Sequence, residues 1–120
     1  MLFIDSLHEA AHVEKLIYAY YPIVNNGGYI IIDDISHLPY LKDKDNNSFY
    51  CEINNKETFE KILSIYTTNT DKFDLNFSFF SSGLAILKKK NNYELVKTKK
   101  IIERSASLKN IIRKIWKKIK

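Results

Sequence analysis

The fold of this chain is decided by residues 25–40, which read NNGGYIIIDDISHLPY. Two asparagines followed by two glycines are typical of a turn. The next four residues are aromatic or β-branched without alternating polar positions, so we predict a strand of a parallel sheet that is covered on both faces. This strand ends at Asp33 and Asp34. The pattern therefore predicts a buried strand with two carboxylates at its carboxyl-terminal tip.

A second short strand is predicted at residues 1–5, MLFID, which also end in an acid, Asp5. The residues between the two strands predict a helix over about 9–21, because apolar side chains recur there at spacings of three and four. Those side chains are Ala10, Val13, Leu16, Ile17 and Tyr20. Strand, helix and strand in this order are typical of a βαβ unit with parallel strands.

The remaining elements follow from the same patterns. Residues 36–55 are polar and predict a long loop that would cover a ligand. Residues 56–67 predict a helix, and residues 73–80 and 84–90 predict two antiparallel strands joined by a tight turn. The apolar face of the helix would consist of Phe59, Ile62, Leu63 and Tyr66.

The three aspartates at the predicted strand tips suggest a metal site. Neighbouring parallel strands lie about 4.8 Å apart, so Asp5, Asp33 and Asp34 would meet at one edge of the sheet. Crowded carboxylates suit Mg²⁺ or a similar hard cation. The alternative is that these aspartates cap a turn or a helix, and Asp5 stands well placed to cap the helix that follows it.

Four segments in order, LFID, GGYIIIDD, FDLNFSFF and GLAILKK, resemble the second half of Rossmann-like methyltransferases that use S-adenosylmethionine. The resemblance covers about residues 1–90. It implies an α/β fold with a partial Rossmann-like sheet, in which these segments are strands four to seven and the last two form an antiparallel hairpin. Residues 91–120 would be a basic tail with an amphipathic helix.

Within that class, the chain is most similar to metal-dependent O-methyltransferases of the catechol, macrocin and cephamycin-related types. The resemblance implies that Asp5, Asp33 and Asp34 hold Mg²⁺ and that a small molecule with a hydroxyl group is the methyl acceptor. His8 stands where the catechol type has a lysine base, so it is a candidate base, since imidazole titrates near neutral pH. A solvated histidine in the first turn of a helix is the alternative.

The resemblance implies S-adenosylmethionine as the methyl donor, but the chain lacks the elements that bind it. Its three glycines, Gly27, Gly28 and Gly83, do not form a G-x-G-x-x-G motif. We therefore expect a carboxyl-terminal fragment that is inactive alone, with an exposed edge at residues 1–5 where another copy or a different chain could pair. The alternatives are a non-catalytic interaction module and a metal-free nucleotide-binding half-domain.

The positive charge of the chain is concentrated in its tail. Residues 1–98 carry 10 Lys and Arg against 13 Asp and Glu, a net of −3, whereas residues 99–120 carry 9 against 1, a net of +8. Residues 107–120 predict an amphipathic helix with Ser107 as its N-cap. Such a helix could bind an anionic membrane, contact nucleic acid or pack on the domain or a second subunit; nucleic acid is the least favoured of these.

Two further features bear on location. Cys51 is the single cysteine, which excludes an internal disulfide and favours a reducing, cytoplasmic compartment. No apolar run approaches the roughly 20 residues that span a bilayer. The sequence therefore predicts a cytoplasmic protein that could lie peripherally on a membrane.

Overall fold

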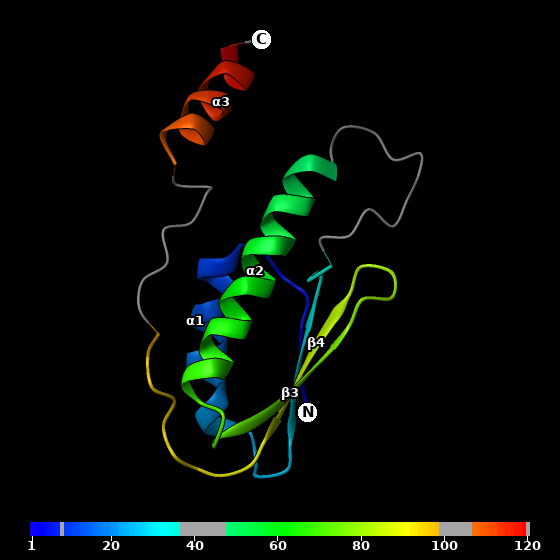
Figure 1. Ribbon diagram of the computed structural model, residues 1–120, viewed down its shortest axis with the longest axis vertical. Helices are drawn as coiled ribbons and strands as arrows, with labels where there is room; N and C mark the ends of the chain where they lie inside the picture. Colours follow the sequence, from blue (N-terminus) through cyan, green and yellow to red (C-terminus); the bar gives the residue numbers. More distant parts are fainter. Residues whose placement is uncertain (8, 37–47, 99–106, 120) are drawn as a thin grey trace.

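A computed structural model describes residues 1–7, 9–36, 48–98 and 107–119. They form a mixed α/β arrangement with one four-stranded sheet in the order β1-β2-β4-β3 (Figure 1). The elements are β1 (Leu2–Ile4), α1 (Ala10–Tyr20), the 3₁₀ turn η1 (Tyr21–Ile23), β2 (Tyr29–Asp33), α2 (Ser48–Thr68), β3 (Phe73–Ser78), β4 (Leu84–Lys89) and α3 (Leu108–Ile119).

The pairing of the strands confirms two predictions. β1 and β2 are parallel, with Leu2 opposite Ile30 and Ile4 opposite Ile32. β3 and β4 form the predicted antiparallel hairpin. β4 also pairs with β2 in antiparallel fashion, so the last strand of the chain lies inside the sheet and β3 lies at its edge.

Helices α1 and α2 pack against the same face of the sheet (Figure 1). Ile30 and Ile32 of β2 are buried beneath them. Tyr29, the first residue of β2, is exposed. The prediction that β2 is covered on both faces is therefore wrong for the described part of the chain. A continuous apolar run does not show whether one face or both faces of a strand are covered, because Ile31 supplies an apolar side chain on the open face as well.

The helices differ from their predicted form in three places. α2 begins at Ser48, so residues 48–55 are helical rather than part of a loop. Tyr21 is buried instead of Tyr20, because a 3₁₀ turn with three residues per turn follows α1 at this point. In α2, Ile65 is buried and Leu63 is exposed. Polar residues on the buried face of α2 hide this pattern from an apolar count; they include Asn55, Thr58 and Lys61.

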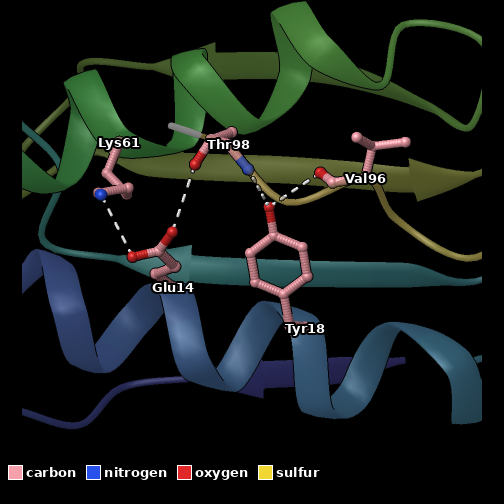
Figure 2. A network of polar contacts seen from close by, with 5 residues as sticks. All are labelled: Glu14, Tyr18, Lys61, Val96 and Thr98. Carbon is pink, nitrogen blue, oxygen red and sulfur yellow. Dashed lines mark hydrogen bonds and ion pairs between the residues drawn. The ribbon is translucent and has the colours of Figure 1, made fainter. Parts of the chain in front are cut away.

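The segment after β4 is held against α1, and α1 is in turn linked to α2 (Figure 2). The Tyr18 hydroxyl donates to the carbonyl of Val96 and accepts from the backbone N–H of Thr98, both at 3.1 Å. The Thr98 hydroxyl donates to Glu14 at 3.3 Å, and the other carboxylate oxygen of Glu14 lies 3.2 Å from the Lys61 ammonium. Residues 96–98 are therefore fixed to the sheet-and-helix unit.

Tyr21 gives this fold a pH dependence. Its buried hydroxyl donates to the carbonyl of Lys72 at 2.7 Å and contacts that of Asn91 at 3.2 Å. Burial, followed by the negative charge of Asp71, raises the pKa of Tyr21 above its ordinary value of 10.0. The stabilisation that the neutral Tyr21 hydroxyl gives to the fold is complete below about pH 10. It is lost as the pH rises through the pKa of Tyr21 in the folded state, because the tyrosine of the unfolded chain ionises first.

We expect Tyr21→Phe to lower the free energy of unfolding by about 1 kcal/mol at pH 7. We also expect it to reduce the further loss of stability above pH 10, as measured by urea unfolding across the alkaline range. Tyr20→Phe is the matched control, since Tyr20 is an exposed neighbour. Equal alkaline losses in wild type and Tyr21→Phe would contradict the assignment.

Candidate functional site

The pairing of β1 with β2 brings the predicted acids to the carboxyl-terminal end of the two strands, on the same side of the sheet. Because Ile4 pairs with Ile32, Asp5 and Asp33 follow at neighbouring positions of two parallel strands. Asp5 is exposed and Asp33 is half-buried. The prediction that the two acidic tips lie side by side is therefore confirmed.

The Asp33 carboxylate is held in place by two donors. One of its oxygens, Oδ1, accepts from the backbone N–H of Asp34 at 2.7 Å and from the Ser82 hydroxyl at 2.8 Å. Ser82 belongs to the turn between β3 and β4. These contacts fix the Asp33 carboxylate at the tip of β2 and link it to the turn between β3 and β4.

Asp5 does not have the capping role considered for it. The N-cap position of α1 is Glu9, which makes no side-chain capping hydrogen bond. Asp5 lies four residues earlier in the chain and is solvent-exposed. Its carboxylate is therefore placed at the sheet edge rather than at the first turn of the helix.

Asp34 has an unusual backbone conformation, with φ at +59°. Aspartate adopts the left-handed region more readily than most residues, but a non-glycine residue there still costs about 1 kcal/mol. After Asp34 the chain stays close to the hairpin, because the N–H of Ser36 donates to the carbonyl of Ser82 at 2.8 Å.

A buried polar cluster lies next to this tip. The side-chain amide of Asn55, on α2, donates to the carbonyl of Ser36 at 2.8 Å. The hydroxyls of Ser36 and Thr58 are buried without a hydrogen-bond partner among the described residues. The first half of α2 is thus attached to the end of β2 through polar contacts, which the apolar pattern of the sequence could not indicate.

Aromatic side chains stand beside the acidic edge. The ring centroid of Phe59 lies 4.8 Å from that of Phe77 and 5.6 Å from that of Phe79. Phe80, two residues before Ser82, is almost fully exposed. Phe59 was predicted on the apolar face of a helix, and Phe77, Phe79 and Phe80 on a hairpin, but the contacts of Phe59 with the hairpin were not predicted. The signal for them was the run of aromatics that leads into the SSG turn.

The described residues do not by themselves form a metal-binding group. His8 and residues 37–47, with most of the loop expected to cover a ligand, lie outside the described part of the chain. Within residues 1–7, 9–36, 48–98 and 107–119, no group of three or more histidine, cysteine, aspartate or glutamate side chains is arranged to hold a metal ion. Asp5, Asp33 and Asp34 share an edge without forming a closed set of three ligands.

Comparison with known proteins adds one structural similarity. No protein-family profile matches the chain, and no curated protein matches it by sequence. One similar solved structure is described as "a putative caffeoyl-CoA O-methyltransferase from Staphylococcus aureus", with 21% identity and a TM-score of 0.49. The match covers 72% of this chain and 40% of that protein, so the chain spans less than half of its length.

Proposed function

We propose that this chain supplies the metal- and acceptor-binding half of an O-methyltransferase that uses S-adenosylmethionine. The observation that carries the proposal is the parallel register of β1 and β2, which brings Asp5 beside Asp33. Two parallel strands joined by a helix and followed by an antiparallel hairpin also match the order of elements that the sequence resemblance implies.

The proposed roles follow from the positions of the side chains. Asp5, Asp33 and Asp34 would supply oxygen ligands to Mg²⁺, with Asp33 oriented by the Ser82 hydroxyl. Mg²⁺ bound there would lower the pKa of the acceptor hydroxyl. The role of His8 as the base rests on the sequence resemblance alone.

Methyl transfer would also need a donor-binding half, which the resemblance assigns to other strands of the same sheet. Among the described residues, β1 pairs only with β2 and lies at the sheet edge, where Phe3 is 52% exposed. An apolar edge of this kind favours the addition of another strand. We propose that donor-binding strands pair along β1, contributed by another chain or by further residues.

Binding of a divalent cation tests this proposal without any requirement for catalysis. We expect the 120-residue chain to bind Mg²⁺ or Mn²⁺ in a calorimetric titration, and Asp34→Asn to weaken binding by about tenfold or more because one ligand charge is lost. Asparagine tolerates the left-handed conformation of position 34. Asp33→Asn should act similarly, since its amide oxygen can still accept from Ser82.

Glu60→Gln is the matched control for loss of one negative charge. Glu60 is exposed on α2, where its carboxylate lies 3.9 Å from the Lys56 ammonium. Its removal should leave cation binding unchanged. A chain that binds no divalent cation, or Asp34→Asn and Asp33→Asn variants that bind as tightly as wild type, would refute the metal site.

A further inference from the structure

Helix α3 presents an apolar face to solvent. Six large apolar side chains, between 46% and 79% exposed, lie within an arc of about 140° around the helix axis. They are Leu108, Ile111, Ile112, Ile115, Trp116 and Ile119. Contiguous exposed apolar surface of this kind usually marks an interaction site. In the described part of the chain, nothing packs over this face closely enough to bury any of the six.

Positive charges border the apolar face on both sides. At 100° per residue, Lys109 falls next to Trp116 and Lys118 falls next to Ile111, while Arg113 lies toward the opposite side. All three basic residues are exposed. The helix contains no aspartate or glutamate. A partner for this surface must therefore combine an apolar interior with negative charges at its boundary.

We propose that α3 lies flat on an anionic lipid surface. Its apolar face would enter the boundary between headgroups and acyl chains, and its bordering lysines would contact lipid phosphates, as in other basic amphipathic helices. None of the described helices is long and apolar enough to cross a bilayer. This inference is independent of the proposed methyltransferase function.

The chemistry of α3 favours lipid over the two other partners considered. Nucleic acid binding is dominated by phosphate contacts and would leave the six apolar side chains in water. Pairing of α3 with a second copy would cover those side chains but would bring Lys109 and Lys118 of both copies to the borders of the contact. The helix has no acid to pair with them, whereas anionic lipid supplies the opposite charge.

Because of the contacts at residues 96–98, binding of α3 to lipid would also affect where the rest of the molecule lies. Thr98 is fixed to α1 through Tyr18 and Glu14, so the chain that leads to α3 departs from a fixed point (Figure 2). Attachment of α3 to a membrane would hold the sheet-and-helix unit near the lipid surface.

Trp116 makes the proposal directly measurable, because it is the single tryptophan of the chain. We expect its fluorescence to shift to the blue when the full chain meets vesicles of phosphatidylcholine mixed with phosphatidylglycerol. Pure phosphatidylcholine vesicles should produce a much smaller shift. Added salt should weaken binding to the anionic vesicles, because it screens the lysines.

Substitutions separate the two contributions to binding. Replacing Ile112 and Ile115 together by glutamine should weaken vesicle binding by about a hundredfold or more, because the contacts of two apolar side chains with the lipid are lost without any change of charge. Lys109→Gln and Lys118→Gln should each weaken it about fivefold. Lys88→Gln is the matched control, since Lys88 is an exposed lysine on β4, outside α3. It should leave vesicle binding unchanged.

Three results would overturn the proposal. They are the absence of a blue shift with anionic vesicles, an equal shift with single-stranded DNA, and a concentration-dependent shift without lipid, which would indicate that a second copy covers the apolar face. The titrations contain a chelator of divalent cations and include Asp34→Asn, which should bind vesicles like wild type. Failure of lipid binding is thereby distinguished from failure of the metal site.

Discussion

Replacing Lys89 by methionine should lower the free energy of unfolding by about 3 kcal/mol, although methionine fills a similar volume. Lys89 is only 3% exposed, and its ammonium donates to the carbonyls of Tyr21 at 2.9 Å, Val24 at 2.8 Å and Pro22 at 3.3 Å. These carbonyls lie where α1 and η1 end, and the last carbonyls of a helix lack intrahelical donors. Methionine would remove the ammonium donor from the buried Tyr21 carbonyl and from the two partly buried carbonyls, and would remove the favourable charge at the helix end.

Urea unfolding at neutral pH measures this effect, and the preceding residue provides the control. Lys88 is exposed on the opposite face of β4, where its ammonium lies 5.8 Å from the centre of the Tyr29 ring. Lys88→Met should change the free energy of unfolding by less than about 0.5 kcal/mol. Similar losses for the two variants would show that the three carbonyl contacts of Lys89 do not stabilise the fold.

Lys89 illustrates what the sequence could and could not reveal. Three consecutive lysines at the end of LAILKKK suggest a solvated strand end. The alternation of side chains along the strand does indicate that Lys89 is buried, since Ala85, Leu87 and Lys89 share one face and the first two are buried. The acceptors of the ammonium could not be predicted, because they come from the end of α1, far away in the chain.

The strands were predictable because their signals are local. Apolar runs and turn residues define each strand, and the length of the connection between residues 5 and 29 favours a parallel pair. The start of α2 at Ser48 was missed, because the polar residues 41–48 resemble a loop and the buried face of the helix itself contains Asn55 and Thr58. Whether a polar side chain is buried depends on its hydrogen-bond partners, which the sequence does not identify.

The candidate site was likewise predicted only in part from the sequence. The common edge for Asp5 and Asp33 follows from the order of strands and was predicted correctly. The hydrogen bond from Ser82 to Asp33 was not predicted, because it requires β4 to lie between β2 and β3. That strand order results from packing of the hairpin against β2, which no local pattern specifies.

Gly83→Ala should lower the free energy of unfolding by about 3 kcal/mol or more, because left-handed alanine costs about 1–2 kcal/mol and the added methyl group must also displace its neighbours. Gly83 has φ at +84°, and a Cβ atom there would lie 2.6 Å from the backbone nitrogen of Ser36. The chain after β2 would have to move away from the hairpin. That movement would break the hydrogen bond from the Ser36 N–H to Ser82 and disturb the Ser82 contact that orients Asp33.

Gly27→Ala measures the conformational part of this effect alone, and the difference between the two variants gives the steric part. Gly27 has a similar φ of +75°, but no atom lies within 4 Å of the position of an added Cβ. Its substitution should cost only the conformational part, about 1–2 kcal/mol, and should leave cation binding unchanged. Urea unfolding and cation titration of both variants measure the difference. Equal losses of stability would mean that the contact between Gly83 and Ser36 does not fix the end of β2, and the geometry that brings Asp33 to the sheet edge would need another explanation.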